Sequence, residues 1–389
     1  MAINENIINI LNEYNITENE LTDLLKQNSV NYDIYGDLNS TKIKNIKTLL
    51  ETIYFSLKSE SDEKTHKRKK ITDDFFNDID INEDLLYKYS PELLELLLAD
   101  RTTGKNIIWG TDDYETFGSD CKRDKEIKPE LITGDRTGII RPRVKKAKEE
   151  KDRRTKEKAE VFTPSWVCNK QNNLVDNAWF GVSDLFNTEK KNGWETHKKN
   201  IVFPEYKTWK DYITDTRLEI TCGEAPYLVS RYDTVNGNKI KLYRRIGLLD
   251  RKMRVICENT DNKHRINWMT WTKKAYQNIY GYDFQGDNVL LAREALLASF
   301  YEYYKSMNFG EPLLKKELLE IGEIISWNIW QMDGLTMMPP FEEYSDNSNM
   351  NTFDFENGGE LAPVNNYSKI MDWEEGKIIT FKSIGESNE

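Results

Sequence analysis

The chain has 389 residues, of which 38% are hydrophobic and 31% are charged, and its formal net charge is -11. This length exceeds the usual size of one compact domain and predicts two domains, or one domain with an appended segment. The negative charge argues against a protein that coats nucleic acid non-specifically, although a local basic groove is compatible with it.

The cysteines and the apolar runs indicate in which cellular compartment the protein is expected. The four cysteines lie far apart without a C-x-x-C pair, and no histidines are placed to complete a zinc site. We therefore expect free thiols, a reducing cytoplasm and no metal. The N-terminus lacks a signal-peptide pattern, and apolar runs such as Leu93 to Ala99 are too short to span a bilayer. A soluble, cytoplasmic protein without a membrane partner is expected.

Residues 1–70 predict a helical N-terminal region with a charged linker. From Asn4 to Leu57 apolar residues recur at helical spacing, and Thr17 to Glu20 match a capping box. Ser59 to Lys70 is charged and poor in apolar residues, which is typical of an exposed linker. We interpret this region as a helical packing or partner-binding domain.

Residues 71–158 predict a small α/β region that ends in a basic connecting helix. A helical pattern over Ile71 to Leu98 precedes two polar turns, at 100–110 and 133–143, that each run into a short apolar strand. Between Arg141 and Glu160, basic and acidic residues alternate at helical spacing, so an exposed salt-bridged helix explains the pattern. The alternative is an element that follows DNA phosphates. Its candidate DNA-binding residues are Arg143, Lys145, Lys146, Arg153 and Arg154.

A helix start follows this connector at Phe162-Thr163-Pro164. Thr163 suits the capping position and Pro164 suits the first turn, so a helix from Ser165 to Asn177 is predicted. Phe162 adds a flat apolar surface beside this start. The aromatic residues between Ala178 and Asp215 are expected to lie mostly in the core.

The stretch from Arg217 to Leu228 predicts a strand, a tight turn and a second helix start. Leu218 to Cys222 has the residues of a short strand, Gly223 permits the turn, and Pro226 fits the first position of a helix. Such a junction lets a small ligand lie against exposed N–H groups at a positive helix end.

The following segment, Tyr232 to Ile256, predicts a hairpin around an Asn-Gly turn. Its arginines line either a basic surface or an ordinary solvated face; they are Arg244, Arg245, Arg251 and Arg254.

Two further strands precede acidic residues. A helix over Ile266 to Asn278 leads into a strand that ends at Asp283, and another helix follows from Val289 to Tyr304. A helix over Leu313 to Ile325 leads into the segment that contains Asp333. Residues 341–389 predict a flexible loop and a C-terminal hairpin.

These features, in this order, resemble the S-adenosylmethionine-dependent DNA methyltransferases. The chain is similar to the N6-adenine enzymes found as modification subunits of restriction systems, over about Ala159 to Leu335. The resemblance implies an α/β fold in which residues 159–340 form a Rossmann-like class I methyltransferase core. It implies S-adenosylmethionine as cofactor, double-stranded DNA as partner, and a restriction or specificity subunit as a further partner.

The resemblance also implies roles for single residues. In the family, the Phe-Thr-Pro segment caps the cofactor and the glycine turn holds it, with alanine here in place of the second glycine. Asp283 would hold the ribose hydroxyls and Asp333 would bind the adenine. The implied cofactor-binding residues are Phe162, Thr163, Pro164, Glu219, Gly223, Ala225, Asp283 and Asp333.

The catalytic segment departs from the family pattern. Where the family has Asn-Pro-Pro-Tyr or Asp-Pro-Pro-Tyr, which holds a flipped adenine, this chain has Met338-Pro339-Pro340-Phe341. Met338 cannot accept the hydrogen bond of an amide or carboxylate, and Asp333 lies too close to leave room for a fourth strand. Pro339, Pro340 and Phe341 are the remaining catalytic candidates, and the catalytic half of the sheet is expected to be truncated or altered.

Two functions therefore stay open. One is an adenine methyltransferase or modification subunit, and the other is a catalytically inactive methyltransferase-like subunit that binds DNA or a partner protein. A nuclease would rest on Glu205-Tyr206-Lys207 and Glu375-Gly376-Lys377, but such triplets arise by chance in so charged a chain.

Overall fold

The computed structural model describes residues 7, 21, 22, 25, 42–49, 76, 79–146, 163–342 and 366–386. The chain divides into two compact units, Met1–Lys70 and Ile71–Glu389. The described residues of the first unit are helical, as the apolar spacing predicts; Ile7, Leu21, Leu25 and Ile46 among them are buried, and Ile43 and Leu49 are partly buried. The capping box at 17–20 and the linker at 59–70 lie outside the described residues.

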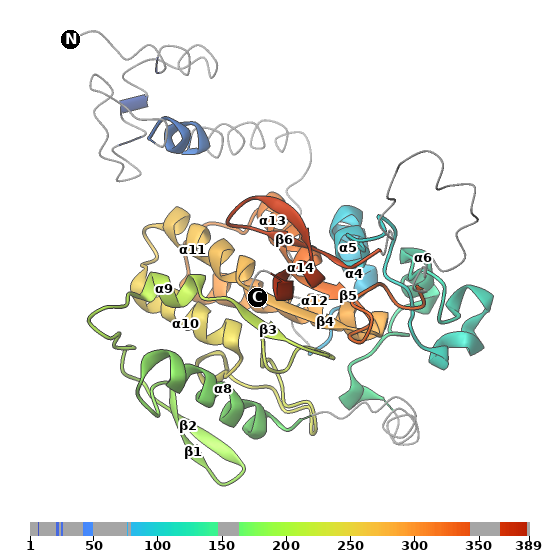
Figure 1. Cartoon of the computed structure of the whole chain (residues 1–389), viewed down its shortest axis with the longest axis horizontal. Coiled ribbons are helices and arrows are strands. Elements are labelled where there is room, and N and C mark those ends of the chain that lie inside the picture. Colours follow the sequence, from blue (N-terminus) through green and yellow to red (C-terminus); the bar gives the residue numbers. More distant parts are fainter. Residues whose placement is uncertain are drawn as a thin grey trace, which may run out of the picture. The chain divides into compact units, whose positions relative to one another are not determined.

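A parallel three-stranded sheet lies at the centre of the second unit (Figure 1). Its order is β3 (Arg217–Glu219), β4 (Ile279–Asp283) and β5 (Ile329–Gln331), with Leu218 opposite Tyr280 and Tyr282 opposite Trp330. Helices make both crossovers, which parallel strands require. They are α10 (Leu248–Asn259), α11 (Arg265–Gln277), α12 (Gly286–Met307) and α13 (Lys315–Asn328). The prediction of a mixed α/β fold is confirmed at this level.

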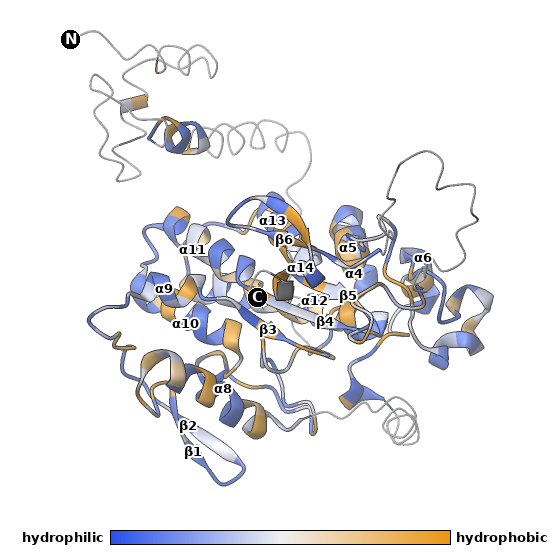
Figure 2. Cartoon of the chain, viewed as in Figure 1, coloured by the Kyte–Doolittle hydropathy of each residue, from blue (hydrophilic) through white to orange (hydrophobic). Residues whose placement is uncertain are grey.

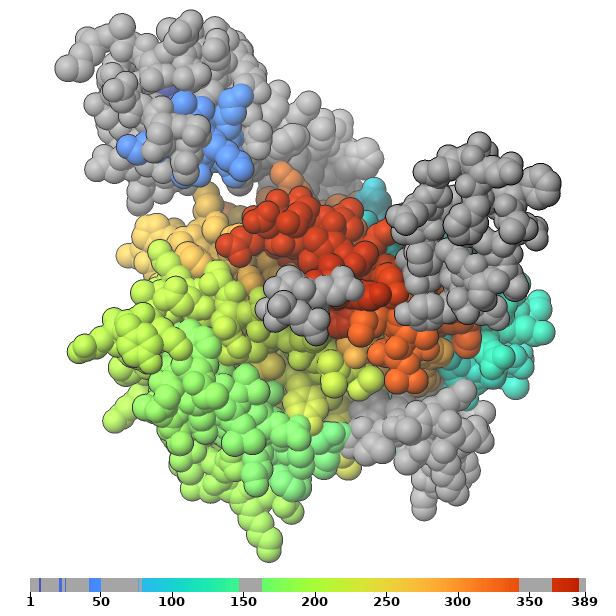
Figure 3. Space-filling model, viewed as in Figure 1, coloured from blue at the N-terminus to red at the C-terminus, as the bar shows by residue number. Residues whose placement is uncertain are grey.

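The two faces of the sheet pack against different layers, because side chains alternate along a strand. Ile279 and Ile329 belong to the main helical core. Tyr282 and Trp330 point to the other face, where they form a second buried cluster with Ile370. This face is covered by the antiparallel hairpin β6 (Lys369–Asp372) and β7 (Lys377–Thr380), followed by α14 (Phe381–Glu386). The predicted C-terminal hairpin is confirmed, and the space-filling view shows it in red beside the orange residues near β5 (Figure 3).

The helices around the sheet carry hydrophobic residues on one side, as α5 (Pro91–Leu98) and α13 illustrate (Figure 2). Ser90 caps α5 by accepting from the Leu93 N–H, and Pro91 occupies its first turn. Gly322 of α13 permits the close approach of α5, because a Cβ there would lie 2.9 Å from Leu93 Cδ1. The remaining described helices are α4 (Glu83–Tyr89), α6 (Pro129–Ile132), α8 (Ser165–Phe180) and α9 (Trp209–Thr214).

Three local predictions are wrong. No helix begins at Pro226; the helix begins instead at Leu248, where the N–H groups of Leu248 and Leu249 donate to the carbonyls of Tyr227 and Leu228. The Asn-Gly turn forms, with Tyr232 bridged to Lys239, but the predicted return strand lies in α10. Residues 133–143 contain short 3₁₀ turns in place of a strand. The contact between the start of α10 and residues 227 and 228 is long-range, whereas the 3₁₀ turns are closed by short-range bonds such as that from the Thr137 N–H to the Gly134 carbonyl.

Within the described part of the chain, every helix is too short or too polar to cross a lipid bilayer.

Candidate functional site

A pocket of about 740 Å³ opens where β3 and β4 end and faces the side of α8. Its volume falls in the range of small-molecule sites, and its position at the carboxyl ends of parallel strands is where open α/β sheets bind ligands. The lining includes Thr163, Gln171, Asn172 and Val175 from α8 and its start, residues 218–223, 226, 227 and 248 around the β3 turn, and residues 283–285 and 288 after β4.

The turn after β3 has an unusual backbone. Thr221, Gly223 and Ala225 have φ values of 46°, 53° and 58°, so three alternate residues adopt the left-handed conformation. This conformation is costly for alanine and more so for a β-branched threonine. Glu219 supports the turn from within, because its carboxylate accepts the N–H groups of Tyr227 at 3.4 Å and Leu228 at 3.2 Å.

Asp283 links the two strand ends. Its Oδ2 accepts the Gly223 N–H at 2.9 Å, and its Oδ1 accepts the Gln285 N–H at 2.9 Å and the Asn288 side chain at 3.3 Å. These bonds leave one lone pair of the carboxylate free for a ligand hydroxyl or amine. The backbone donors that would hold a phosphate in a glycine-rich loop are therefore used here by carboxylates of the protein.

The electrostatics of the pocket are acidic. Burial raises the pKa of Glu219 well above its usual range, and burial also raises the pKa of Asp283, in each case against the effect of the backbone N–H groups. The neighbouring Asp283 raises the pKa of Glu219 further. Among the described residues that line the pocket there is no lysine, arginine or histidine. Such a site favours a neutral or cationic ligand and opposes a polyphosphate.

The wall formed by α8 is held by polar contacts at its middle and at its start. Asn172 donates to the carbonyls of Tyr227 and Ile246, which ties the middle of the helix to the β3 turn. The first N–H of the helix, at Ser165, donates to Asp233 Oδ2 at 3.0 Å. The prediction that Thr163 caps this helix is therefore wrong: the cap comes from the Asn-Gly turn, and the carbonyl of Thr163 accepts from Thr234.

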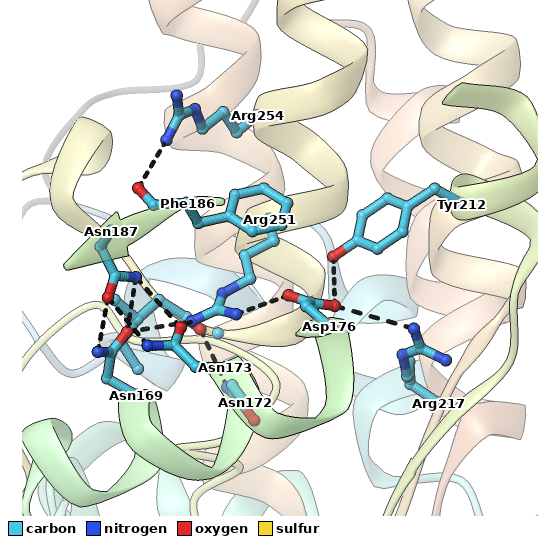
Figure 4. Close-up of polar contacts among 12 residues, drawn as sticks. Asn169, Asn172, Asn173, Asp176, Phe186, Asn187, Tyr212, Arg217, Arg251 and Arg254 are labelled. Carbon is cyan, nitrogen blue, oxygen red and sulfur yellow. Dashed lines mark hydrogen bonds and ion pairs between the residues drawn. The ribbon is translucent and has the colours of Figure 1, made fainter. Parts of the chain in front are cut away.

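A buried network fixes α8 against α10 and β3 (Figure 4). Arg251 donates to Asp176 at 2.6 Å, to Asn173 at 2.7 Å and to Asn169 at 3.0 Å. Tyr212 donates to Asp176, and Arg217 of β3 lies 3.8 Å from the same carboxylate. The prediction that Arg251 lies on a solvated or basic face is therefore wrong.

Four of the residues that the family resemblance assigns to the cofactor line this one pocket: Thr163, Glu219, Gly223 and Asp283. They come from three separate parts of the chain. Ala225 lies in the same turn, fully buried, behind the lining. Pro164 precedes α8 outside the lining, and Phe162 lies outside the described residues.

Asp333 lies outside the pocket. It is part of a turn after β5, where its N–H donates to the Met338 carbonyl and its Oδ1 accepts from the Leu335 N–H. The role predicted for Asp333 does not fit this position.

The Met338-Pro339-Pro340-Phe341 segment lies outside the pocket lining and adjoins it through its aromatic residue. Met338, Pro339 and Pro340 are buried, whereas Phe341 is 46% exposed. The Phe341 ring packs edge-on against Phe284, which lines the pocket, with centroids 5.4 Å apart. An aromatic surface thus adjoins the pocket, while Met338 offers no amide or carboxylate there.

The predicted DNA-binding residues have internal partners where they are described. Lys146 is buried and lies 3.3 Å from Asp287, so it does not present its charge to a phosphate. Lys145 lies 3.5 Å from Asp80, and the backbone N–H of Arg143 donates to the Glu224 carboxylate. Arg153 and Arg154 lie outside the described residues.

The polar stripe of α8 was not among the expected site residues. Asn169, Asn172, Asn173 and Asp176 recur at i, i+3, i+4 and i+7, which places them on one helix face. Amides and a carboxylate at core spacing are the signal that could have identified them.

Searches for relatives found no match to the chain among protein-family models, curated proteins or solved structures.

Proposed function

We propose that the protein binds S-adenosylmethionine and acts as a DNA adenine-N6 methyltransferase, or as the modification subunit of a restriction-modification system. One observation carries the proposal. Thr163, Glu219, Gly223 and Asp283, which the sequence resemblance assigns to the cofactor, line a single pocket at the ends of two parallel strands.

The chemistry of the pocket supports this ligand over other nucleotides. S-adenosylmethionine carries ribose hydroxyls, for which Asp283 keeps one acceptor site, and a positive sulfonium, which a described lining without basic side chains does not repel. ATP and NAD carry phosphates, for which the described lining offers no basic side chain. Methyl transfer itself needs mainly positioning of the sulfonium against the target amine. It is therefore compatible with a lining whose carboxyl groups, on Glu219 and Asp283, already accept backbone N–H groups of the protein.

A second function is favoured by the segment beside the pocket. Met338 is 1% exposed and provides no hydrogen-bond acceptor of amide quality for a target amine. The alternative function is therefore a methyltransferase-like subunit that binds cofactor and DNA. In this case a partner protein completes the catalytic site, which explains why Met338 can stand where the family has an amide or carboxylate.

Ligand binding is tested by titration calorimetry and thermal unfolding. S-adenosylmethionine at about a hundred times its dissociation constant should stabilise the protein by about 2.7 kcal/mol, whereas ATP and NAD should have little effect. Ile220 lines the pocket and is 63% exposed, so Ile220→Trp should block binding without unfolding the protein. Ile378 is 54% exposed on β7, outside the pocket lining, and Ile378→Trp is the matched control.

The outcomes are distinct. The cofactor proposal fails if S-adenosylmethionine gives no stabilisation, if ATP binds equally well, or if Ile220→Trp binds the cofactor as well as the control does. If the cofactor binds, methyl transfer to adenine-containing duplexes, alone and with co-expressed neighbouring reading frames, separates the enzyme from the non-catalytic subunit.

A further inference from the structure

A second cavity, of about 660 Å³, opens on a different part of the molecule. It lies between the hairpin of β1 (Asn187–Lys190) and β2 (Gly193–Thr196) and the segment 242–245. Figure 1 shows this hairpin projecting beyond α8. Trp194 joins the two walls, because its Nε1 donates to the Arg244 carbonyl at 2.9 Å.

Unpaired positive charges surround this cavity. Lys198 lines it, and Lys199, Lys241 and Arg244 adjoin residues that line it. All four are exposed, and none forms an ion pair with a described residue. We call these four residues the hairpin cations.

The acidic groups of the cavity are compensated or buried. Glu258 is held by Arg254 at 2.7 Å. Asp250 lies on the buried floor, where it accepts from Ser230. On the adjoining hairpin, Glu195 pairs with Lys190 at 3.2 Å. Glu189 of β1 is also exposed, but Lys190 and Lys191 beside it are exposed as well, so the outward-facing charge of this region is positive on a chain whose net charge is -11.

Aromatic side chains accompany the cations. Tyr243 lines the cavity and is 60% exposed, which leaves its ring available for stacking. The Arg244 guanidinium lies 5.6 Å from the Trp194 ring centroid, so this cation is oriented before any ligand arrives. Cations beside an exposed aromatic ring bind nucleic acid through its phosphates and, where bases are unpaired, through stacking.

We infer that the hairpin cations and Tyr243 form the DNA-binding face of this protein. The choice of DNA as the partner rests on the proposed function, whereas the location rests on this charge and aromatic pattern. The face replaces the predicted basic connector in this role as far as the connector is described, because Lys145 and Lys146 there are engaged by Asp80 and Asp287.

Fluorescence anisotropy with a labelled DNA duplex at several salt concentrations tests the inference on the full chain. Replacing the four hairpin cations by glutamine should lower the salt slope by about 3 to 4 and raise Kd at fixed salt about 30-fold or more. The bases of a duplex stack on one another, so Tyr243 is tested with a labelled single strand, for which Tyr243→Ala should raise Kd about tenfold and leave the salt slope unchanged. A control variant replaces four other exposed lysines, Lys105, Lys128, Lys263 and Lys274, by glutamine and should bind like the wild type.

Three results would overturn the inference: a wild-type protein that does not bind DNA, a hairpin variant that binds as tightly as the control, and displacement of DNA by polyglutamate at equal charge concentration. The last result would assign the face to an acidic protein. Calorimetry with S-adenosylmethionine on the same variants should be unaffected. If the wild type binds DNA but does not bind S-adenosylmethionine, that result would count against the proposed function and not against this DNA-binding face.

Discussion

Replacing Arg251 by methionine should destabilise the protein more than any change of a surface charge. The Arg251 side chain is 1% exposed and serves three buried acceptors, on Asp176, Asn169 and Asn173. Methionine retains most of the volume but provides no donor. The Asp176 carboxylate would keep only the Tyr212 hydroxyl and the more distant Arg217.

The magnitude follows from the charge left behind. Breaking a buried ion pair by removing one partner costs about 3–5 kcal/mol, and the presence of Arg217 places this case near about 3 kcal/mol. Because α8 forms one wall of the pocket, the same change should also weaken ligand binding there. Removing the orphaned charge in the double variant Asp176→Asn, Arg251→Met should recover part of the lost stability.

Urea unfolding of the wild type and the variants measures these differences. Lys88→Met, which removes an exposed partner of Asp84, is the control and should leave the unfolding midpoint unchanged. A loss below about 1 kcal/mol for Arg251→Met, or a double variant less stable than the single one, would refute a charge-dependent network.

Three further changes test other parts of the structure. Burial raises the pKa of Glu83 to about 8, from an ordinary value of 4.5, so its contribution to stability should be complete below about pH 4.5 and lost as the pH rises through about 8. Glu83→Gln should flatten this fall in urea unfolding at pH 5, 7 and 9, and an unchanged slope would contradict the assignment. Ala225→Val places a β-branched side chain at a φ of 58° in a fully buried turn and should lower the free energy of unfolding by more than about 2 kcal/mol. Ala225→Gly should change it by less than about 1 kcal/mol. Equal thermal shifts for the two variants would argue against a left-handed residue at this position. Burial raises the pKa of Cys257 to about 11 and that of Cys168 to about 12. Ellman's reagent at pH 8 should therefore modify these two thiols far more slowly in the native protein than in urea. Rapid labelling of the native protein would show instead that they are accessible thiolates.

Elements whose signals are local could be predicted from the sequence. The helical spacing after Ser165, the strand that ends at Asp283 and the C-terminal hairpin all appear close to their expected bounds. Each depends on neighbours a few residues apart, through side-chain periodicity, a capping position or a tight turn. The family resemblance also assigned Glu219, Gly223 and Asp283 to one cofactor site, and they line one pocket because the parallel strands that carry them end at one edge of their sheet.

The character of the site was decided by contacts between distant parts of the chain. Asp283 accepts the N–H of Gly223, 60 residues earlier in the chain. The carbonyls of Tyr227 and Leu228 accept the first N–H groups of a helix that begins 20 residues after Leu228. Asp287 neutralises Lys146, from which it is separated by 141 residues. Side-chain periodicity carries no information about such pairings. The same donor or charged group can face solvent or meet a buried partner, and only the fold decides which. The sequence by itself determined which segments end at the pocket; only the tertiary structure decided which of their polar groups remain available to a ligand.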